Sequence, residues 1–247
     1  MGVTCQSNTN SIVIALALAP RLVLTPLHAD LWIAPVPYRT MGLAIGRQII
    51  VARLPSGGLW IHSPIPWTPA LRTALAPLGP VLHVVGPNRQ HDECLNEFQA
   101  EYPAAIFHAA PGLAESRRDL RFAPTPLGDE PPPNWRGTID QCLVRGMPFL
   151  NEIVFLHRPS RSLIIADLAF NFAPDTHWSV KLLLKLGGTW GRFAPSRAGR
   201  LMMRDRPAVR ASLDRILAWD FDRILVGHGR NIETDARQRL RDAFAFL

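Results

Sequence analysis

The chain has 247 residues, 47% of them hydrophobic, which is long enough for one large α/β domain or two small ones with a substantial core. Three scattered cysteines, Cys5, Cys94 and Cys142, form no CxxC pattern. They argue against a disulfide framework and a zinc–thiolate site, and they favour a reducing, cytoplasmic compartment. The formal net charge of +7 is carried almost entirely by arginine.

The C-terminal part of the chain is rich in arginine, with twelve arginines between Arg192 and Arg241. A basic segment of this kind is one mark of a surface that binds nucleic acid or phosphate. Here the arginines alternate with aspartates, which is typical of an ordinary solvated helix face. The pattern favours the solvated face, so nucleic acid is not expected as a partner.

Residues 1–28 are predicted to be an N-terminal extension that precedes a single domain over residues 29–247. The apolar run at 12–19 has the length of a signal peptide, but no Lys or Arg precedes it and Arg21 separates it from the next apolar residues. A misplaced start and a weak export signal are the alternatives for this segment. No stretch of the sequence is apolar over the length of a membrane span, so no membrane partner is expected.

The first half of the domain predicts a hairpin followed by alternating strands and helices. The predicted strands are 31–33, 48–54, 59–62, 81–85 and 105–108, and the predicted helices are 68–76, 88–101 and 111–118. Thr68 is the expected N-cap of the first helix, with Pro69 at its first position. Asn88 is the expected N-cap of the second. Five prolines within 124–135 predict a loop rather than a core element.

The second half repeats this order, beginning with a hairpin. The predicted strands are 138–145, 152–158, 162–166 and a run around Ile224, and the predicted helices are 178–186, 207–219 and 234–246. Asp205 opens the second of these helices. The approximate twofold order predicts two packed sheets with helices outside.

Two of these strands end on a possible metal ligand. Asp167 follows the strand at 162–166, and His228 follows the Ile224 strand between two glycines that permit close approach of the backbone. Reactive side chains at the carboxyl ends of buried strands emerge into loops, where they can form a site. A turn-capping aspartate and a histidine in a glycine-rich turn are the structural alternative.

Four segments resemble an uncharacterised branch of the metallo-β-lactamase superfamily. They are 53–64 (RLPSGGLWIHSP), 86–92 (GPNRQHD), 160–168 (SRSLIIADL) and 219–229 (WDFDRILVGHG). The resemblance covers about Leu31 to Leu247. It implies an α/β fold, the four-layer αββα sandwich of metallo-β-lactamase type, and a hydrolase that uses metal ions.

The metal-binding motif of the superfamily is degenerate in this chain. The resemblance implies His-x-His-x-Asp-His after the strand at 81–85, but the first two histidines are absent. A third histidine, expected between Met147 and Glu152, is also absent. The residues that remain would serve one divalent metal, which is zinc, manganese or iron. The implied ligands are His91, Asp92, Asp167 and His228, with Glu152 as a possible additional carboxylate.

Several of these residues have a structural alternative. Asn88 is a possible supporting residue of the site, but helix capping also explains it. The helix dipole explains Asp92 in a first helical turn, whereas an imidazole at His91 gains nothing from that position. His62 ends its strand where the superfamily often has an aspartate that orients a ligand, but it could equally be a packed strand-end histidine. His83 lies within an apolar strand and is expected to be structural.

Two functions remain open from the sequence. The first is a hydrolase with one metal ion, in which His91 or Asp92 completes the site or acts as the base for an unknown small-molecule substrate. The second is a non-catalytic member of the fold that binds a small anion or a protein partner. The pocket is expected under the Pro-rich loop 124–135 and the segment 187–200.

Overall fold

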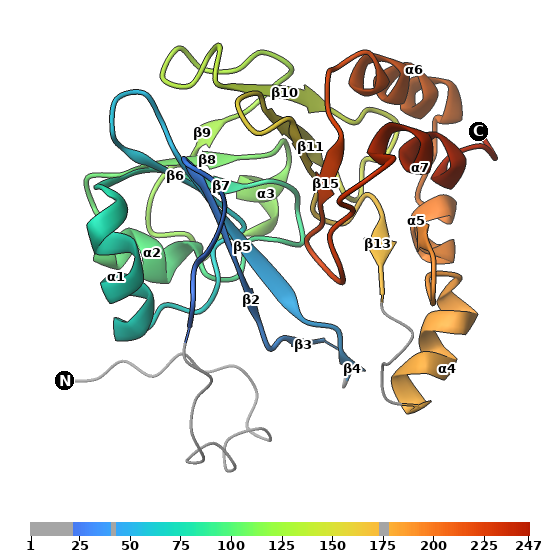
Figure 1. Ribbon diagram of the computed structural model, residues 1–247, viewed down its shortest axis with the longest axis horizontal. Helices are drawn as coiled ribbons and strands as arrows, with labels where there is room; N and C mark the ends of the chain where they lie inside the picture. Colours follow the sequence, from blue (N-terminus) through green and yellow to red (C-terminus); the bar gives the residue numbers. More distant parts are fainter. Residues whose placement is uncertain (1–21, 41–42, 173–177) are drawn as a thin grey trace.

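The computed structural model describes residues 22–40, 43–172 and 178–247, which form two β-sheets flanked by helices (Figure 1). The large sheet has the strand order β1 (Thr25–His28), β2 (Leu31–Val36), β5 (Arg47–Arg53), β6 (Leu59–His62), β7 (Val81–Gly86), β8 (Ile106–Ala109) and β9 (Thr125–Pro126). Its first four strands pair antiparallel, and β6 to β9 pair parallel.

The small sheet has the order β10 (Ile139–Leu143), β11 (Ile153–His157), β12 (Ser162–Ile164) and β15 (Arg223–Leu225). Strands β10 to β12 form an antiparallel meander, and β15 joins β12 in parallel. Two further strand pairs are short: β3 (Arg39–Thr40) with β4 (Leu43–Ala44), and β13 (Phe170–Asn171) with β14 (Phe193–Ala194).

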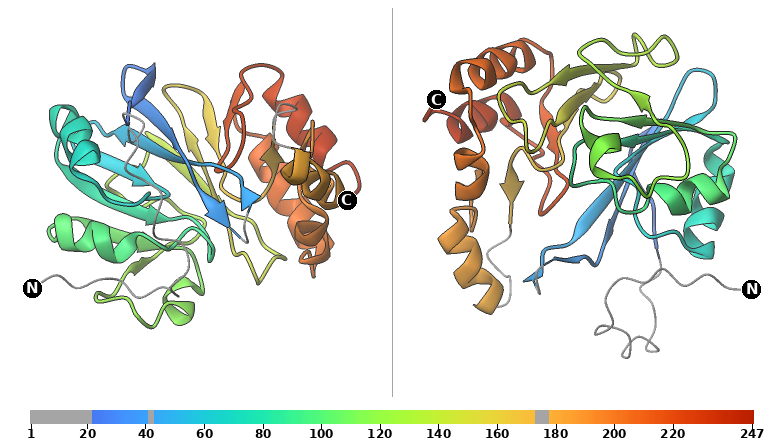
Figure 2. Two further views of the ribbon diagram at one scale, coloured as in Figure 1. Left: turned by 90° about the horizontal axis from the view of Figure 1, so that it is seen from below. Right: turned by 180° about the vertical axis from the view of Figure 1, so that it is seen from behind.

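Helices cover the outer faces of both sheets, so the chain is the predicted four-layer αββα sandwich (Figure 2). The large sheet carries α1 (Pro69–Leu75), which continues into the 3₁₀ turn η1 (Ala76–Leu78), α2 (Leu95–Glu101) and α3 (Leu113–Ser116). The small sheet carries α6 (Arg206–Leu217) and α7 (Ala236–Ala243), with α4 (Trp178–Gly187) and α5 (Arg197–Leu201) beside them.

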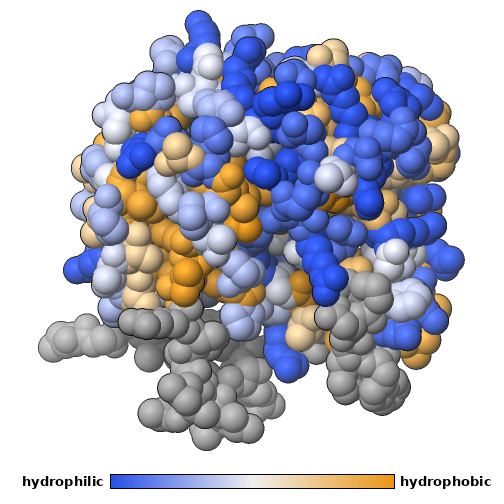
Figure 3. Space-filling view, viewed as in Figure 1, coloured by the Kyte–Doolittle hydropathy of each residue, from blue (hydrophilic) through white to orange (hydrophobic). Residues whose placement is uncertain are grey.

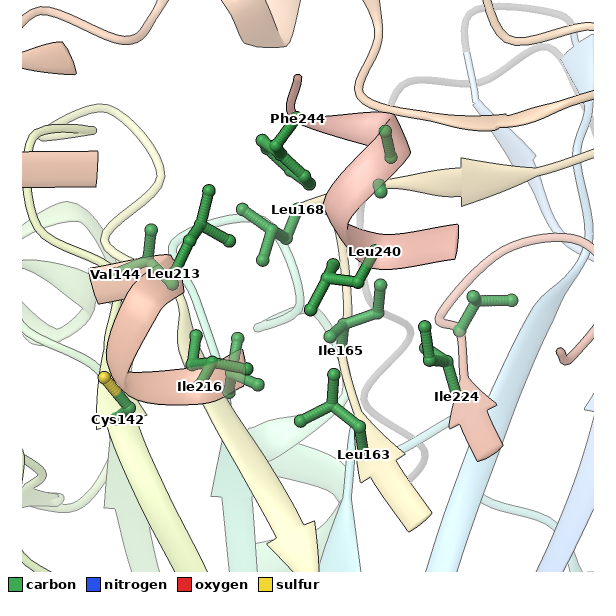
Figure 4. Close-up of a cluster of buried hydrophobic side chains, with 14 of the residues drawn as sticks. Cys142, Val144, Leu163, Ile165, Leu168, Leu213, Ile216, Ile224, Leu240 and Phe244 are labelled. Carbon is green, nitrogen blue, oxygen red and sulfur yellow. The ribbon is translucent and has the colours of Figure 1, made fainter. Parts of the chain in front are cut away.

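Each interface between layers is an apolar core. On β5, Ile49 and Val51 face the helices, whereas Ile50 and Ala52 face the other sheet. A strand buried on both faces therefore reads as a continuous apolar run. On the far side, side chains from the small sheet, α6 and α7 interdigitate (Figure 4).

The second predicted helix begins later than its sequence indicates. It was expected from Asn88, but α2 begins at Leu95, and residues between them form turns. The Asn88 Oδ1 atom accepts hydrogen bonds from the backbone N–H groups of Gln90 and His91, both at 2.8 Å. This local bonding satisfies donors that a helix start would otherwise leave free, so the chain stays in a loop.

The Pro-rich loop 124–135 contributes to the core, contrary to the sequence expectation. Trp135 is 1% exposed and packs between the sheets with Trp60 and Leu127. Its indole Nε1 donates to Gln141 Oε1 at 3.3 Å. Regular structure in this segment is limited to the two-residue strand β9, but the prolines do not prevent burial, because burial depends on where the neighbouring elements leave space.

Several short elements were not predicted. Strand β1 lies within the segment 1–28 that was expected to be an extension, so the large sheet begins before residue 29. Strands β3, β4, β13 and β14 have two residues each, and α5 has five. Such elements are too short for a periodic pattern.

The apolar run at 12–19 lies outside the described residues. Among the described residues, no helix is both long and apolar enough to cross a membrane.

A buried histidine pair makes stability sensitive to acid. His83 Nδ1 and His108 Nε2 lie 3.1 Å apart, and both rings meet Trp135 edge-on. Burial lowers the pKa of His108 to about 3. The folded state keeps His108 neutral while the unfolded chain binds a proton below about pH 6.5, so its contribution to stability is lost as the pH falls.

We expect this residue alone to decrease the free energy of unfolding by about 1.4 kcal/mol per pH unit between roughly pH 6 and pH 4. Urea unfolding of the metal-free protein across this range measures the slope. The variant His108→Asn, which keeps a polar partner for His83, should show a shallower slope. An identical slope in both proteins would contradict the assignment.

Candidate metal centre

Three of the predicted site residues meet at the edge of the two sheets. His91 Nε2 lies 3.3 Å from Asp167 Oδ2, and His228 Nε2 lies 3.4 Å from Asp167 Oδ1. The two imidazole Nε2 atoms are 3.1 Å apart. The sequence pattern at Asp167 and His228 thus marked two residues that the fold brings together.

The parallel pairing of β12 and β15 places Asp167 and His228 side by side. Ile164 pairs with Leu225, and Asp167 and His228 each come three residues after their member of this pair. The position before His228 requires glycine, because a Cβ atom on Gly227 would lie 2.6 Å from the Ala166 carbonyl oxygen and 2.9 Å from His91 Cε1. Gly229 has φ +97°, in the left-handed region that favours glycine.

The spacing of the three donors fits a metal ion. Tetrahedral zinc with bonds of about 2.0–2.1 Å requires ligand atoms about 3.3 Å apart, and octahedral coordination brings adjacent ligands slightly closer. The two Nε2 atoms are 3.1 Å apart, and each lies within 3.4 Å of an Asp167 oxygen, Oδ2 for His91 and Oδ1 for His228, so each of these contacts is close to the spacing of neighbouring ligand atoms. His91, Asp167 and His228 could therefore hold one ion through one atom each.

Hydrogen bonds at the far side of each imidazole orient the two rings. His228 Nδ1 lies 2.5 Å from the Gly46 carbonyl oxygen. A carbonyl only accepts, so Nδ1 carries the hydrogen of this contact and leaves Nε2 as the atom that could bind a metal. His91 Nδ1 lies 2.5 Å from Ser63 Oγ, and this hydroxyl can accept from Nδ1 when Nε2 serves as the ligand.

The charge states of the group suit a cation. Burial lowers the pKa of His91 to about 4, so this imidazole is neutral near pH 7. Burial alone would raise the pKa of Asp167, but the adjacent His91 and His228 hold it well below its ordinary value. The group therefore offers a carboxylate charge beside neutral imidazole nitrogen, which is the donor chemistry that zinc and ferrous iron accept.

A hydrogen-bonded pair lies where the resemblance implies further histidines. Asn88, in the loop after β7, donates from Nδ2 to Glu152 Oε2 and to Asp167 Oδ2, both at 2.9 Å. Glu152 also accepts from the backbone N–H groups of Ala166 and Asp167 at 2.9 and 2.7 Å. Burial, followed by the charge of Asp167, raises the pKa of Glu152 to about 7. Glu152 thus supports Asp167 through the backbone and Asn88.

Asp92 and His62 do not belong to the group formed by His91, Asp167 and His228. Asp92 Oδ1 is 3.5 Å from Arg117 Nη1, and its backbone carbonyl accepts from the same guanidinium. The side chain and the backbone carbonyl of Asp92 therefore both contact Arg117. His62 stacks on Trp60, with ring centroids 5.7 Å apart, and among the described residues neither of its ring nitrogens has a hydrogen-bond partner. Burial lowers the pKa of His62 well below its ordinary value, and the charges of His91, Arg47 and Asp167 also act on it, so this buried ring lies near the group.

His91, Asp167 and His228 line a pocket of about 350 Å³. Its other walls include Tyr38, Arg47, Glu93, Phe170 and Met202 from elements far apart in the sequence. The predicted segment 187–200 contributes Ser196, Ala198 and Gly199, but no residue of the loop 124–135 lines this pocket. The predicted location of the pocket was therefore correct for the second segment and wrong for the first.

Residues that complete the site carried no recognisable motif. Arg47 is buried and donates from Nη1 to Glu93 Oε2 at 3.1 Å, and the Tyr38 hydroxyl donates to Glu93 Oε1 at 2.9 Å. Ser63 follows β6 with φ +56°, which is unusual for a residue with a side chain. Only the pairing of strands places Gly46 and Ser63 behind the two imidazoles.

Removing the Ser63 hydroxyl is expected to weaken metal binding by roughly 10- to 100-fold, since partners that orient a histidine ligand commonly have effects of this size. Titration calorimetry with zinc on Ser63→Ala measures the change. Ser63→Gly is the matched control, because glycine tolerates the positive φ but also lacks the hydroxyl. Wild-type affinity in Ser63→Gly would show that the backbone, not the hydroxyl, matters.

Comparison with solved structures identifies the fold. A DIM-1 metallo-β-lactamase exposed to ceftazidime has a TM-score of 0.64 at 12% identity, covering 93% of this chain and 99% of that one. A metallo-β-lactamase family protein from Thermus thermophilus has a TM-score of 0.56 at 17% identity, covering 90% and 80%. The flavodiiron core of Flv1 from Synechocystis has a TM-score of 0.61 at 11% identity, covering 91% and 60%.

These likenesses show that the chain has the metallo-β-lactamase fold, as the sequence resemblance predicted. No protein-family model matches the sequence, and no curated protein matches it. The proteins with this fold span a β-lactamase and a flavodiiron core, so the fold alone does not assign a reaction.

Proposed function

We propose that the protein is a hydrolase that uses one divalent metal ion held by His91, Asp167 and His228. The observation that carries this proposal is that the three ligands form part of the wall of the 350 Å³ pocket. Structural zinc sites are closed by four protein ligands, whereas catalytic sites have three and keep one position open to water or substrate. A three-ligand group on a pocket wall has the second arrangement.

When bound, the metal would supply Lewis-acid activation of water and of a carbonyl or phosphoryl oxygen of the substrate. The chain itself holds the donors in place. Gly46 and Ser63 fix the rings of His228 and His91, and Asn88 donates to the Asp167 carboxylate. Glu93, which lines the pocket, and Asp167 are the carboxylates placed to accept a proton from water. Asp92 has no part in this proposal, because its side chain pairs with Arg117.

The donor set supports zinc or ferrous iron, with manganese as a third candidate. Two imidazoles and one carboxylate with open positions occur in zinc hydrolases and in non-haem iron sites. The substrate is a small molecule by the size of the pocket. The cytoplasm remains the proposed location, supported by the free, buried Cys94 and Cys142.

Metal-dependent turnover tests the proposed function. Protein stripped with chelator and reloaded separately with zinc, manganese or ferrous iron is assayed against chromogenic esters, phosphate mono- and diesters, lactones and β-lactams. We expect turnover of at least one class that requires metal and disappears in Asp167→Asn. Tight stoichiometric metal binding with no turnover of any class above the Asp167→Asn rate would instead favour a non-catalytic protein that binds a small anion or a protein partner.

A further inference from the structure

Helices α4 and α5 expose a group of large apolar side chains, which we call the α4–α5 patch and define by Leu182, Leu183, Leu186, Leu201 and Met202. The three leucines of α4 are 54%, 47% and 59% exposed, and Leu201 is 80% exposed. Single exposed apolar residues are common on soluble proteins, but several of them on two neighbouring helices are typical of a surface that contacts a partner.

Packing among the described residues does not explain the apolar patch. Val180 and Leu184 form the buried face of α4, where they pack with Phe172. One apolar stripe is enough to hold a surface helix on its domain. The outward leucines Leu182 and Leu186 therefore form a second apolar face that the fold does not need.

The same surface carries a concentration of unpaired positive charge. Residues 181–206 contain seven Lys or Arg and a single acid, Asp205, and both lysines of the chain lie on α4. Lys181 and Lys185 lie over the Trp190 ring, at 4.6 and 4.7 Å from its centroid. Among the described residues, none of these seven cations forms an ion pair, whereas the nearby α6 and α7 arginines Arg215 and Arg237 both pair with aspartates.

The two helices form one continuous surface. A Cβ atom on Gly188, just after α4, would lie 3.3 Å from the Arg197 side chain at the start of α5. Arg192 donates to the Gly188 carbonyl at 2.8 Å. Burial, and then the charges of Arg192 and Arg197, lower the pKa of Arg200, so these guanidinium groups are close enough to repel one another. Figure 3 shows apolar residues at the lower right edge, where α4 lies, directly below strongly hydrophilic ones.

We propose that the α4–α5 patch docks on the surface of a membrane that contains anionic lipids. The leucines would insert at the headgroup boundary, and the lysines and arginines would pair with lipid phosphates. A second copy of the chain fits less well, because a symmetric contact would bring the unpaired cations of both copies together. Nucleic acid fits less well because exposed leucines do not stack on bases. The sequence analysis expected no membrane partner because no stretch is long and apolar enough to span a bilayer. Docking on a membrane surface does not require such a stretch.

The patch borders the candidate metal pocket. Met202, Ser196 and Gly199 line that pocket and belong to α5 or flank it. Docking would therefore place the rim of the pocket against the lipid headgroups. This inference does not depend on metal binding or hydrolysis, since the patch residues are not ligands and a vesicle assay measures binding alone.

Vesicle co-flotation of the full chain tests the proposal. We expect the protein to float with vesicles of phosphatidylcholine that contain a minor fraction of phosphatidylglycerol, and not with phosphatidylcholine alone, at about 0.15 M salt. The double variant Leu182→Ser/Leu186→Ser and the double variant Lys185→Glu/Arg197→Glu should each bind at least tenfold more weakly, since each basic residue near such a surface contributes roughly fivefold.

The matched controls substitute exposed residues of the same kinds that lie outside the α4–α5 patch. Val23→Ser removes another exposed apolar side chain, and Arg210→Glu/Arg239→Glu reverses two exposed cations of α6 and α7; both should float like the wild type. No flotation with anionic vesicles would overturn the proposal. So would flotation that survives both patch variants but is lost on Ile14→Asp in the apolar run 12–19. A dimer in sedimentation that Leu182→Ser/Leu186→Ser abolishes, without vesicle binding, would assign the patch to a second copy.

Discussion

Replacing Asp167 with alanine is expected to remove the bound metal and leave the domain folded. Asp167 supplies the only carboxylate of the three-ligand group and lies within 3.4 Å of both imidazole nitrogens. His228→Ala should have the same effect, because two protein ligands rarely retain a transition metal against a chelator. Both residues lie in loops after their strands, outside the apolar clusters. Loss of stability should therefore not exceed the binding free energy of the lost metal.

His83→Ala is the matched histidine control. It removes an imidazole from the core instead of the site, so the metal should remain while the free energy of unfolding falls by about 1–3 kcal/mol. Metal content by mass spectrometry and urea unfolding of the metal-free proteins separate the two effects. If Asp167→Ala or His228→Ala unfolds a protein that never held metal, these residues are structural and the site assignment is wrong.

Trp135→Ala is expected to be the most destabilising single change in the core, at about 3–5 kcal/mol. Trp135 fills the space between the sheets, edge-on to Trp60 at 6.2 Å and to His108 at 4.6 Å. Its removal leaves a cavity lined by rigid strands that cannot collapse, and it leaves Gln141 Oε1 without its indole donor. Urea unfolding gives the change in the free energy of unfolding.

Phe149→Ala is the matched aromatic control, because Phe149 is 52% exposed. Its truncation should change the free energy of unfolding by less than about 0.5 kcal/mol, as is usual for surface positions. A similarly small effect at Trp135 would mean that the Pro-rich loop 124–135 is only loosely attached to the sheets.

Periodic and turn signals predicted most of the long elements. The α1 helix begins as predicted, with Thr68 accepting from Leu71 N–H and Pro69 at the first position, and Asp205 caps α6 in the same way. Strands buried on both faces have unbroken apolar runs, so the residue at which each strand ends can be recognised in the sequence. Asp167 and His228 were predicted for this reason, since both follow such runs.

The remaining features depend on contacts between distant segments. The late start of α2 arises from a side-chain bond at Asn88 that competes with helix capping, and the two outcomes have the same sequence signature. His91 and Asp92 are adjacent in sequence, yet only the loop geometry turns one toward Asp167 and the other toward Arg117. Gly46 and Ser63 support the imidazoles through strand pairing, which no local pattern encodes.

The metal content of protein purified without chelators or a histidine tag shows whether His91, Asp167 and His228 hold an ion. With zinc, manganese and iron each supplied during growth, the three-ligand group predicts about one equivalent of a transition metal per chain. Wild-type protein with about one equivalent, and His228→Ala protein without it, would establish the centre. Less than about a tenth of an equivalent under all three conditions would mean that these residues do not form a metal centre, because a preformed group with these donors should bind metal tightly.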